Sequence, residues 1–155
     1  SVLHQSDYDN PDELKHLMSE TWSSAVLDCG ASKSVCGNEW LTKFTNNLDP
    51  SEKENITYSP SNHVYRFGDG RKIESLKCAR IPALIGSNYF QIETDVVDGD
   101  IPLLLSKSST KRGSMKINFQ DDTITVLNET TPLITTNSGH YAIPITKPKT
   151  TYEQC

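Results

Sequence analysis

The sequence predicts an all-β domain with one or two short helices. At 155 residues the chain has the length of one domain. From residue 22 onward, short runs of β-favouring residues follow one another closely. Turn signals separate these runs, for example at 86–88 (Gly-Ser-Asn) and 98–100 (Asp-Gly-Asp). Such dense short strands are typical of an all-β domain.

A helix is predicted ahead of the strands, over residues 11–18. Asn10 suits the N-cap, and Pro11 suits the first helical position, where its missing N–H is harmless. Leu14 and Leu17 fall on one face of such a helix. We expect this helix either to pack beneath the domain or to serve as a linker.

The remaining elements are short strands separated by loops and two helical turns. Helical turns are expected over 38–46 and over 106–112, where Gly113 suits the C-cap. Residues 46–58 are polar and are bracketed by Asp-Pro and Ser-Pro turn signals, so we expect a loop there. Strands outside the hairpin described below are expected over 24–27, 34–37, 73–84, 89–97, 101–105, 115–119, 123–127, 133–136 and 140–145.

The segment that organises the chain is residues 25–32, Ala-Val-Leu-Asp-Cys-Gly-Ala-Ser. Its three apolar residues predict a buried strand that ends on Asp28. A carboxylate at such a place is poorly hydrated, which is costly unless the group is paired, protonated or functional. Gly30 then permits a backbone geometry that a side chain would block. Asp28 is therefore the leading candidate for a functional residue.

Residues 63–73 carry the best β-hairpin signal in the chain. Tyr65 and Phe67 alternate with polar neighbours, and residues 68–70 (Gly-Asp-Gly) supply the positive φ angles of a tight turn. Taken alone, this pattern indicates an ordinary surface hairpin. Its Gly-Asp-Gly turn lies about 40 residues after Asp28.

Residues 26–31 resemble the active-site signature of aspartic proteases, in which two apolar residues precede Asp-Thr/Ser-Gly-Ala/Ser. The chain is far shorter than a pepsin, which points to the retropepsins of retroviruses and LTR retrotransposons. The resemblance spans roughly residues 22–127. It implies a retropepsin-like closed β-barrel, one half of the acid protease fold per chain, cut from a Gag-Pol-like polyprotein.

The resemblance also implies roles for individual residues, with Asp28 as the catalytic acid. The active-site loop would consist of Cys29, Gly30, Ala31 and Ser32. The flap, a hairpin that closes over a bound peptide, would contain Phe67, Gly68, Asp69 and Gly70. The chemistry needs two carboxylates and no metal or cofactor. Because the sequence holds one such motif, the resemblance implies a homodimer in which each copy supplies Asp28.

Two departures from the family pattern leave alternatives open. Cys29 stands where the family has Thr or Ser, and a thiol is a weak hydrogen-bond donor. The alternatives are a weaker dimer, a redox-sensitive dimer, or a degenerate site kept for binding. Ser106 follows the apolar run 101–105 where the family usually has Gly. Residues 84–86 (Leu-Ile-Gly) keep the glycine, but no predicted helix follows them.

The chain is expected to divide into three segments. Residues 1–21 form an N-terminal segment with the short helix, and residues 22–127 form the retropepsin-like domain. Residues 128–155 form a C-terminal β extension and tail, which we expect to extend the sheet.

Composition bounds the partners and the compartment. The net charge of −5 gives no electrostatic reason to expect nucleic acid as a partner. No apolar run approaches the roughly 20 residues of a membrane span, and the N-terminus has no signal-peptide core. We therefore expect a cytoplasmic protein, and the resemblance adds a retroelement particle as an alternative place within the cell. The four cysteines form no CxxC pair, so zinc-site spacing is absent and free thiols are expected.

Three hypotheses for function remain. The leading one is an aspartic endopeptidase, a hydrolase that cuts polypeptides such as its own polyprotein. The alternative is a catalytically degenerate retropepsin-like domain that binds peptides or drives dimerisation. The third is an unrelated β-barrel interaction module. A Cys–His nucleophile would also need an orienting group and an oxyanion hole, which no pattern in the sequence marks.

Ala31 predicts the pH range of activity. Pepsins commonly carry a hydroxyl at this place that hydrogen-bonds the acid, and its loss removes stabilisation of the charged carboxylate. The paired acids should therefore titrate at higher pH, and cleavage should be fastest nearer neutral pH. A pH–rate profile on a peptide substrate checks this, and a maximum well below about pH 4 would contradict it.

Overall fold

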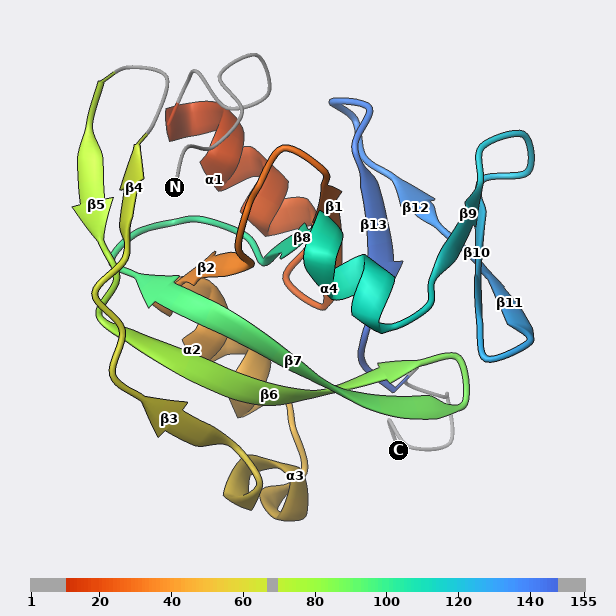
Figure 1. The fold of residues 1–155 in the computed structure, drawn as a ribbon, viewed down its shortest axis with the longest axis horizontal. Helices are drawn as coiled ribbons and strands as arrows, with labels where there is room; N and C mark the ends of the chain where they lie inside the picture. The colour runs from red at the N-terminus through yellow and green to blue at the C-terminus, as the bar shows by residue number, and fades with distance from the viewer. Residues whose placement is uncertain (1–10, 67–69, 148–155) are drawn as a thin grey trace.

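The computed structural model describes residues 11–66 and 70–147, and the fold is mostly β (Figure 1). Its largest element is an eight-stranded sheet in the order β12-β13-β1-β8-β2-β7-β6-β3. The strands of this sheet are β1 (Ser24–Asp28), β2 (Val35–Gly37), β3 (Thr57–Ser59), β6 (Lys77–Ile85), β7 (Asn88–Val97), β8 (Leu104–Ser106), β12 (Ile134–Thr135) and β13 (Tyr141–Pro144). A mostly β fold is confirmed, and residues 11–66 and 70–147 contain four short helices where one or two were expected.

Two smaller sheets flank the large one at opposite ends (Figure 1). One is the β4–β5 hairpin, Val64–Arg66 paired with Lys72–Glu74, which confirms the strands of the predicted hairpin. The other has the order β11-β10-β9. Its strands are β9 (Lys116–Asn118), β10 (Thr123–Val126) and β11 (Glu129–Pro132).

The expected closed barrel is not found among the described residues. The eight-stranded sheet is open, because its end strands β12 and β3 each pair on one side only within residues 11–66 and 70–147. Two parallel pairs, β1 with β8 and β2 with β7, interrupt an otherwise antiparallel order. Strand β1, which leads into the acid loop, and strand β2, which follows the loop, are both central strands of the sheet.

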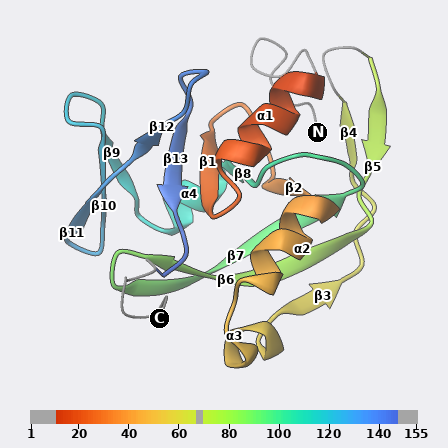
Figure 2. The ribbon, with the colours of Figure 1, turned by 180° about the vertical axis from the view of Figure 1, so that it is seen from behind.

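Alternating side chains on the central strands feed two separate cores. Ala25 belongs to one apolar cluster and the next residue, Val26, belongs to the other, as expected for a strand buried on both faces. Helix α2 (Asn38–Asn46) buries Trp40 and Phe44 in the first cluster and lies across one face of the sheet (Figure 2). The second cluster contains Tyr65 of the hairpin.

Helix α1 (Pro11–Glu20) confirms the helix predicted near the N-terminus. Its Leu14 and Leu17 are buried in the second cluster, together with Val26 and Ala31 of the acid segment. The helix therefore packs beneath the acid loop, which was one of the two expected roles. None of the helices in the described part of the chain is long and apolar enough to cross a membrane.

The loop predicted over 46–58 is wrong in part. Residues Pro50–Glu54 form helix α3, and β3 follows it along the edge of the sheet. Asp49 accepts a hydrogen bond from the backbone of Glu52, whose side chain in turn accepts one from the Asp49 N–H. The Asp-Pro pair is thus the start of a capped helix, with Pro50 in its first turn, and not a simple turn.

Strand β11 was also missed. Leu127 and Asn128 have φ angles of 49° and 67°, the geometry of a tight hairpin turn, which returns the chain antiparallel to β10. Further on, β13 pairs with β1, so residues 141–144 are part of the sheet that holds the acid. The boundary drawn at residue 127 stays a prediction.

The expected helical turn over 106–112 is helix α4, Lys107–Arg112. Ser106 is its N-cap and accepts a hydrogen bond from the Ser109 N–H, and Gly113 is the C-cap residue. The helix begins directly after β8, so its first turn lies at the end of a central strand.

Gly37 sits where two backbones touch, at the end of β2. A Cβ atom added there would lie 2.1 Å from the carbonyl oxygen of Gly99. We expect Gly37→Ala to lower the free energy of unfolding by about 1–3 kcal/mol or more, because neither backbone can move without disturbing the sheet. Chemical denaturation measures the change.

Gly113→Ala is the matched control for this prediction. Gly37 and Gly113 both have a φ of −80°, but the atom nearest to an added Cβ at Gly113 is the flexible Met115 side chain, at 2.8 Å. Its effect should be smaller. Equal losses in the two variants would contradict the close-packing explanation.

Candidate active site

Asp28 is the last residue of β1 and is only 4% exposed. Because alternate residues of a strand share a face, its side chain points to the same side as Val26, towards the core cluster that includes Tyr65 of the hairpin. The Gly30 N–H donates a hydrogen bond to Oδ1 of Asp28 at 3.0 Å. The Ala31 N–H donates to the Asp28 carbonyl at 3.2 Å, which closes the turn. The loop thus aims one backbone N–H, that of Gly30, at the carboxylate.

The predicted loop residues divide into exposed and buried positions. Cys29, Gly30 and Ser32 are exposed, whereas Ala31 is buried in the core cluster beneath the loop. Ala31 therefore anchors the loop by packing. The exposed Cys29 thiol stands next to the acid and is open to reagents or to another copy of the chain.

Ser106 lies opposite Asp28 in the parallel β1–β8 pair. This register places the run that ends in Ser106, and not residues 84–86, beside the acid. Gly86 instead lies in the turn between β6 and β7, with a φ of 62°. Of the two alignments left open by the sequence, the structure favours the one that replaces the family's glycine with Ser106.

Ser34 braces the segment that leaves the loop. Its side chain is buried, and its Oγ accepts a hydrogen bond from the Ser106 N–H at 3.0 Å. The same hydroxyl lies 3.3 Å from the Ser106 Oγ and 3.0 Å from the Ser109 Oγ. These contacts fasten the start of β2 to the end of β8 and to helix α4. Serine hydroxyls can both donate and accept, which suits this shared arrangement.

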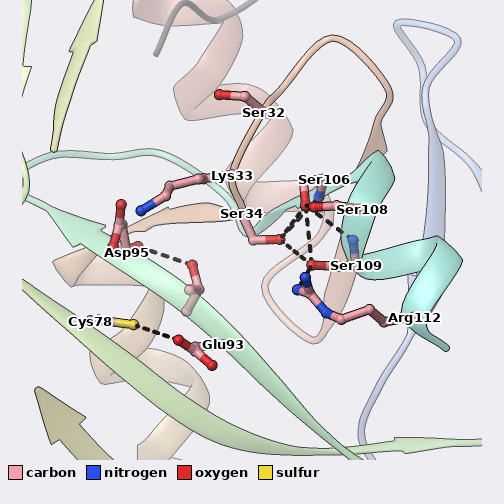
Figure 3. Close-up of a pocket in the computed structure, with 11 residues that line it drawn as sticks. Ser32, Lys33, Ser34, Cys78, Glu93, Asp95, Ser106, Ser108, Ser109 and Arg112 are labelled. Carbon is pink, nitrogen blue, oxygen red and sulfur yellow. Dashed lines mark hydrogen bonds between the residues drawn. The ribbon is translucent and has the colours of Figure 1, made fainter.

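A pocket of about 300 Å³ opens beside these serines (Figure 3). Ser34, Ser106 and Ser109 converge at one side of it, and Arg112 donates to the Ser109 Oγ at 3.2 Å. The remaining lining residues are Ser32, Lys33, Cys78, Glu93, Thr94, Asp95 and Ser108. The lining mixes both charges with neutral hydroxyls, and it includes part of the predicted loop.

Asp95 is a second buried acid. It lies on β7, is 5% exposed, and accepts hydrogen bonds from the Tyr65 hydroxyl at 2.7 Å and the Ser61 Oγ at 2.9 Å. No glycine turn follows it, which is why the sequence did not mark it as an acid of the catalytic type. Its position within the β-favouring run 89–97 could have marked it as a partnered acid, because a charge on a buried strand is costly without hydrogen-bond partners.

The predicted flap is only partly described. Strands β4 and β5 are present, and Gly70 is exposed with a φ of 89°, as a tight turn requires. Phe67, Gly68 and Asp69 lie outside the described residues. Among the residues that are described, no three His, Cys, Asp or Glu side chains gather closely enough to hold a metal ion.

The two buried acids of the described residues differ in their surroundings. Within residues 11–66 and 70–147 the buried acids are Asp28 and Asp95, and Asp95 already holds two hydroxyl donors. Asp28 instead borders an exposed loop.

Comparison with solved structures finds 11 matching chains, among them the following one. The crystal structure of the retroviral protease-like domain of Ddi1 from Leishmania major matches with a TM-score of 0.42 and 16% sequence identity. The match covers 68% of this chain and 75% of that chain. No family model matches the sequence, and no curated protein matches it.

The cysteines differ sharply in accessibility, which predicts their order of alkylation. Cys29 is exposed and Cys36 is fully buried, and burial raises the pKa of the Cys36 thiol to about 12. Burial also raises the pKa of the half-buried Cys78 thiol. Because the thiolate is the reactive form, iodoacetamide at about pH 8 should modify Cys29 first among these three described thiols, and Cys36 only after unfolding.

Peptide mapping by mass spectrometry measures this order. A Cys29→Ser variant is the control and should lose the fast-reacting fraction. Modification of Cys36 in the folded protein as fast as Cys29 would contradict the burial of β2.

Proposed function

We propose that this chain is an aspartic endopeptidase whose attacking water is activated by two Asp28 carboxylates, one from each copy of a homodimer. The observation that carries the proposal is the buried Asp28 at a strand end, with its Oδ1 held by the Gly30 N–H in an Asp-Cys-Gly-Ala loop whose Cys29 and Gly30 are exposed. A β-hairpin that shares the core cluster on the Asp28 side of the sheet supports it.

The paired acids would act as general base and general acid. Two carboxylates held close together cannot both ionise, so the pair shares one proton. The ionised Asp28 takes a proton from the water while the protonated Asp28 donates a hydrogen bond to the scissile carbonyl. A proton then passes to the leaving nitrogen as the carbon–nitrogen bond breaks. Each step needs only groups of the two loops and the substrate.

The substrate would be an extended polypeptide bound between the loops and the β4–β5 hairpins. Phe67 to Gly70 would contact it from the hairpin side, and Cys29 to Ser32 would contact it from the acid side. A parent polyprotein of a retroelement is the natural substrate for such a domain, which would place the reaction in the cytoplasm or in a retroelement particle.

A catalytically silent relative of the same fold is the second candidate. The observation that favours it is Cys29, whose exposed thiol replaces the hydroxyl that the resemblance leads us to expect. A weak donor at this place would hold the two loops together less firmly. Such a domain would still bind an extended peptide without cutting it.

Asp28→Asn tests the proposal because it keeps the size of the side chain and removes the base. We expect the wild type to cleave members of a peptide panel, with inhibition by a statine-type compound. The variant should lose activity by a factor of about 10² to 10⁴ while keeping its melting temperature.

Asp121→Asn is the matched control, since Asp121 lies in an exposed turn before β10. It should cleave as fast as the wild type. If the wild type cleaves no peptide, the assay is repeated with a reductant, which returns oxidised Cys29 to the thiol. Peptide binding without cleavage under those conditions would favour the second candidate, and equal cleavage by Asp28→Asn would refute the proposed mechanism.

A further inference from the structure

We propose that Asp95 is a positioning residue that sets where the β4–β5 hairpin sits relative to the loop that carries Asp28. The proposal rests on the proposed function in one respect, namely that the position of the hairpin affects peptide binding. The contacts themselves belong to the folded chain.

The Asp95 carboxylate receives both of its hydroxyl donors from the hairpin side. The Tyr65 hydroxyl, on β4, donates to Oδ2 at 2.7 Å, and the Ser61 Oγ, just before β4, donates to Oδ1 at 2.9 Å. Tyr65 is completely buried, so its ring and its hydroxyl are both fixed. Hydrogen bonds to a charged acceptor are stronger than those between neutral groups, and burial strengthens them further.

The same carboxylate reaches the second strand of the hairpin through a shared hydroxyl. The Ser61 Oγ lies 2.7 Å from the Ser75 Oγ, and Ser75 directly follows β5. The Ser75 Oγ also accepts a hydrogen bond from the His63 N–H at 2.9 Å, and the Ser75 N–H donates to the His63 carbonyl at 2.8 Å. The segments that enter and leave the hairpin are thus joined at its base, and Asp95 holds that base.

The backbone of Asp95 connects this base to the acid loop. Its N–H donates to the Ser34 carbonyl at 3.0 Å, and Asp95 is paired with Val35 in the parallel β2–β7 ladder. The Ser34 Oγ in turn accepts a hydrogen bond from the Ser106 N–H, and Ser106 lies opposite Asp28. One residue therefore holds the hairpin with its side chain and the exit of the acid loop with its main chain.

This arrangement explains why a charged group stands on an otherwise buried strand end. A pair of apolar residues could bury similar area, but apolar contacts are not directional. Two hydroxyl bonds from one hairpin fix both its distance and its orientation. The height of the hairpin above the acid loop then determines how well an extended peptide fits between them.

Tyr65→Phe tests the proposal because it removes one hydrogen bond and keeps the ring. The amides of Val64–Arg66 and Lys72–Glu74 should exchange with solvent about tenfold faster, whereas the β1 amides stay unchanged. On a cleaved peptide, KM should rise about tenfold while kcat stays within about twofold, because substrate fit changes and the acid pair does not. Ser61→Ala should act in the same direction, and it keeps the test decisive if Tyr65→Phe does not fold.

Tyr58→Phe is the matched control, since it removes the same hydroxyl from an exposed tyrosine on β3. It should leave both hydrogen exchange and KM unchanged. Unchanged exchange in the hairpin of both Tyr65→Phe and Ser61→Ala would overturn the anchoring role, whether or not the protein cleaves peptides. Faster exchange with an unchanged KM would overturn the positioning role. A wild type that cleaves nothing would refute the proposed function, and the exchange result would still decide the anchor.

Discussion

A carboxylate at the end of a buried strand is the constraint on which the rest of this fold depends. Such a group loses hydration, so it needs hydrogen-bond donors from the protein to offset that cost. The turn at Gly30 gives Asp28 a backbone donor, and Ala31 seals the loop against the core. The strands β13 and β8 on either side of β1 fix the place at which the acid emerges.

Two sets of hydrogen bonds stabilise the surroundings of that acid. Serine hydroxyls at Ser34 and Ser106 join the loop exit to the strand beside Asp28. Beyond them, Asp95 joins the loop exit to the β4–β5 hairpin. Ser106 and Asp95 lie on central strands, where the backbone ladder sets their position, and Ser34 directly precedes β2. The result is a rigid frame around a loop whose Cys29 and Ser32 remain exposed.

Local patterns in the sequence were enough to predict most of the elements. The apolar run before Asp28, the two strands of the hairpin at 63–73 and helix α1 all carry signals within a few residues, and each is confirmed. Helix α3 was missed because Asp49-Pro50 signals a turn as readily as a helix start. The open sheet and the contacts of Asp95 depend on residues distant in the chain, for which a single sequence holds no direct signal. The role of the Asp28 loop remains a proposal.

Mixing two forms of the protein tests most directly whether a pair of Asp28 carboxylates does the chemistry. Asp28→Asn is added to a fixed amount of wild type at a concentration where dimers are saturated, and the rate of peptide cleavage is measured. If each site needs an Asp28 from both copies, an equimolar mixture should lose about half of the wild-type rate, and a ninefold excess should leave about a tenth. A rate that stays constant across the titration would show that one chain works alone, and would contradict the shared site.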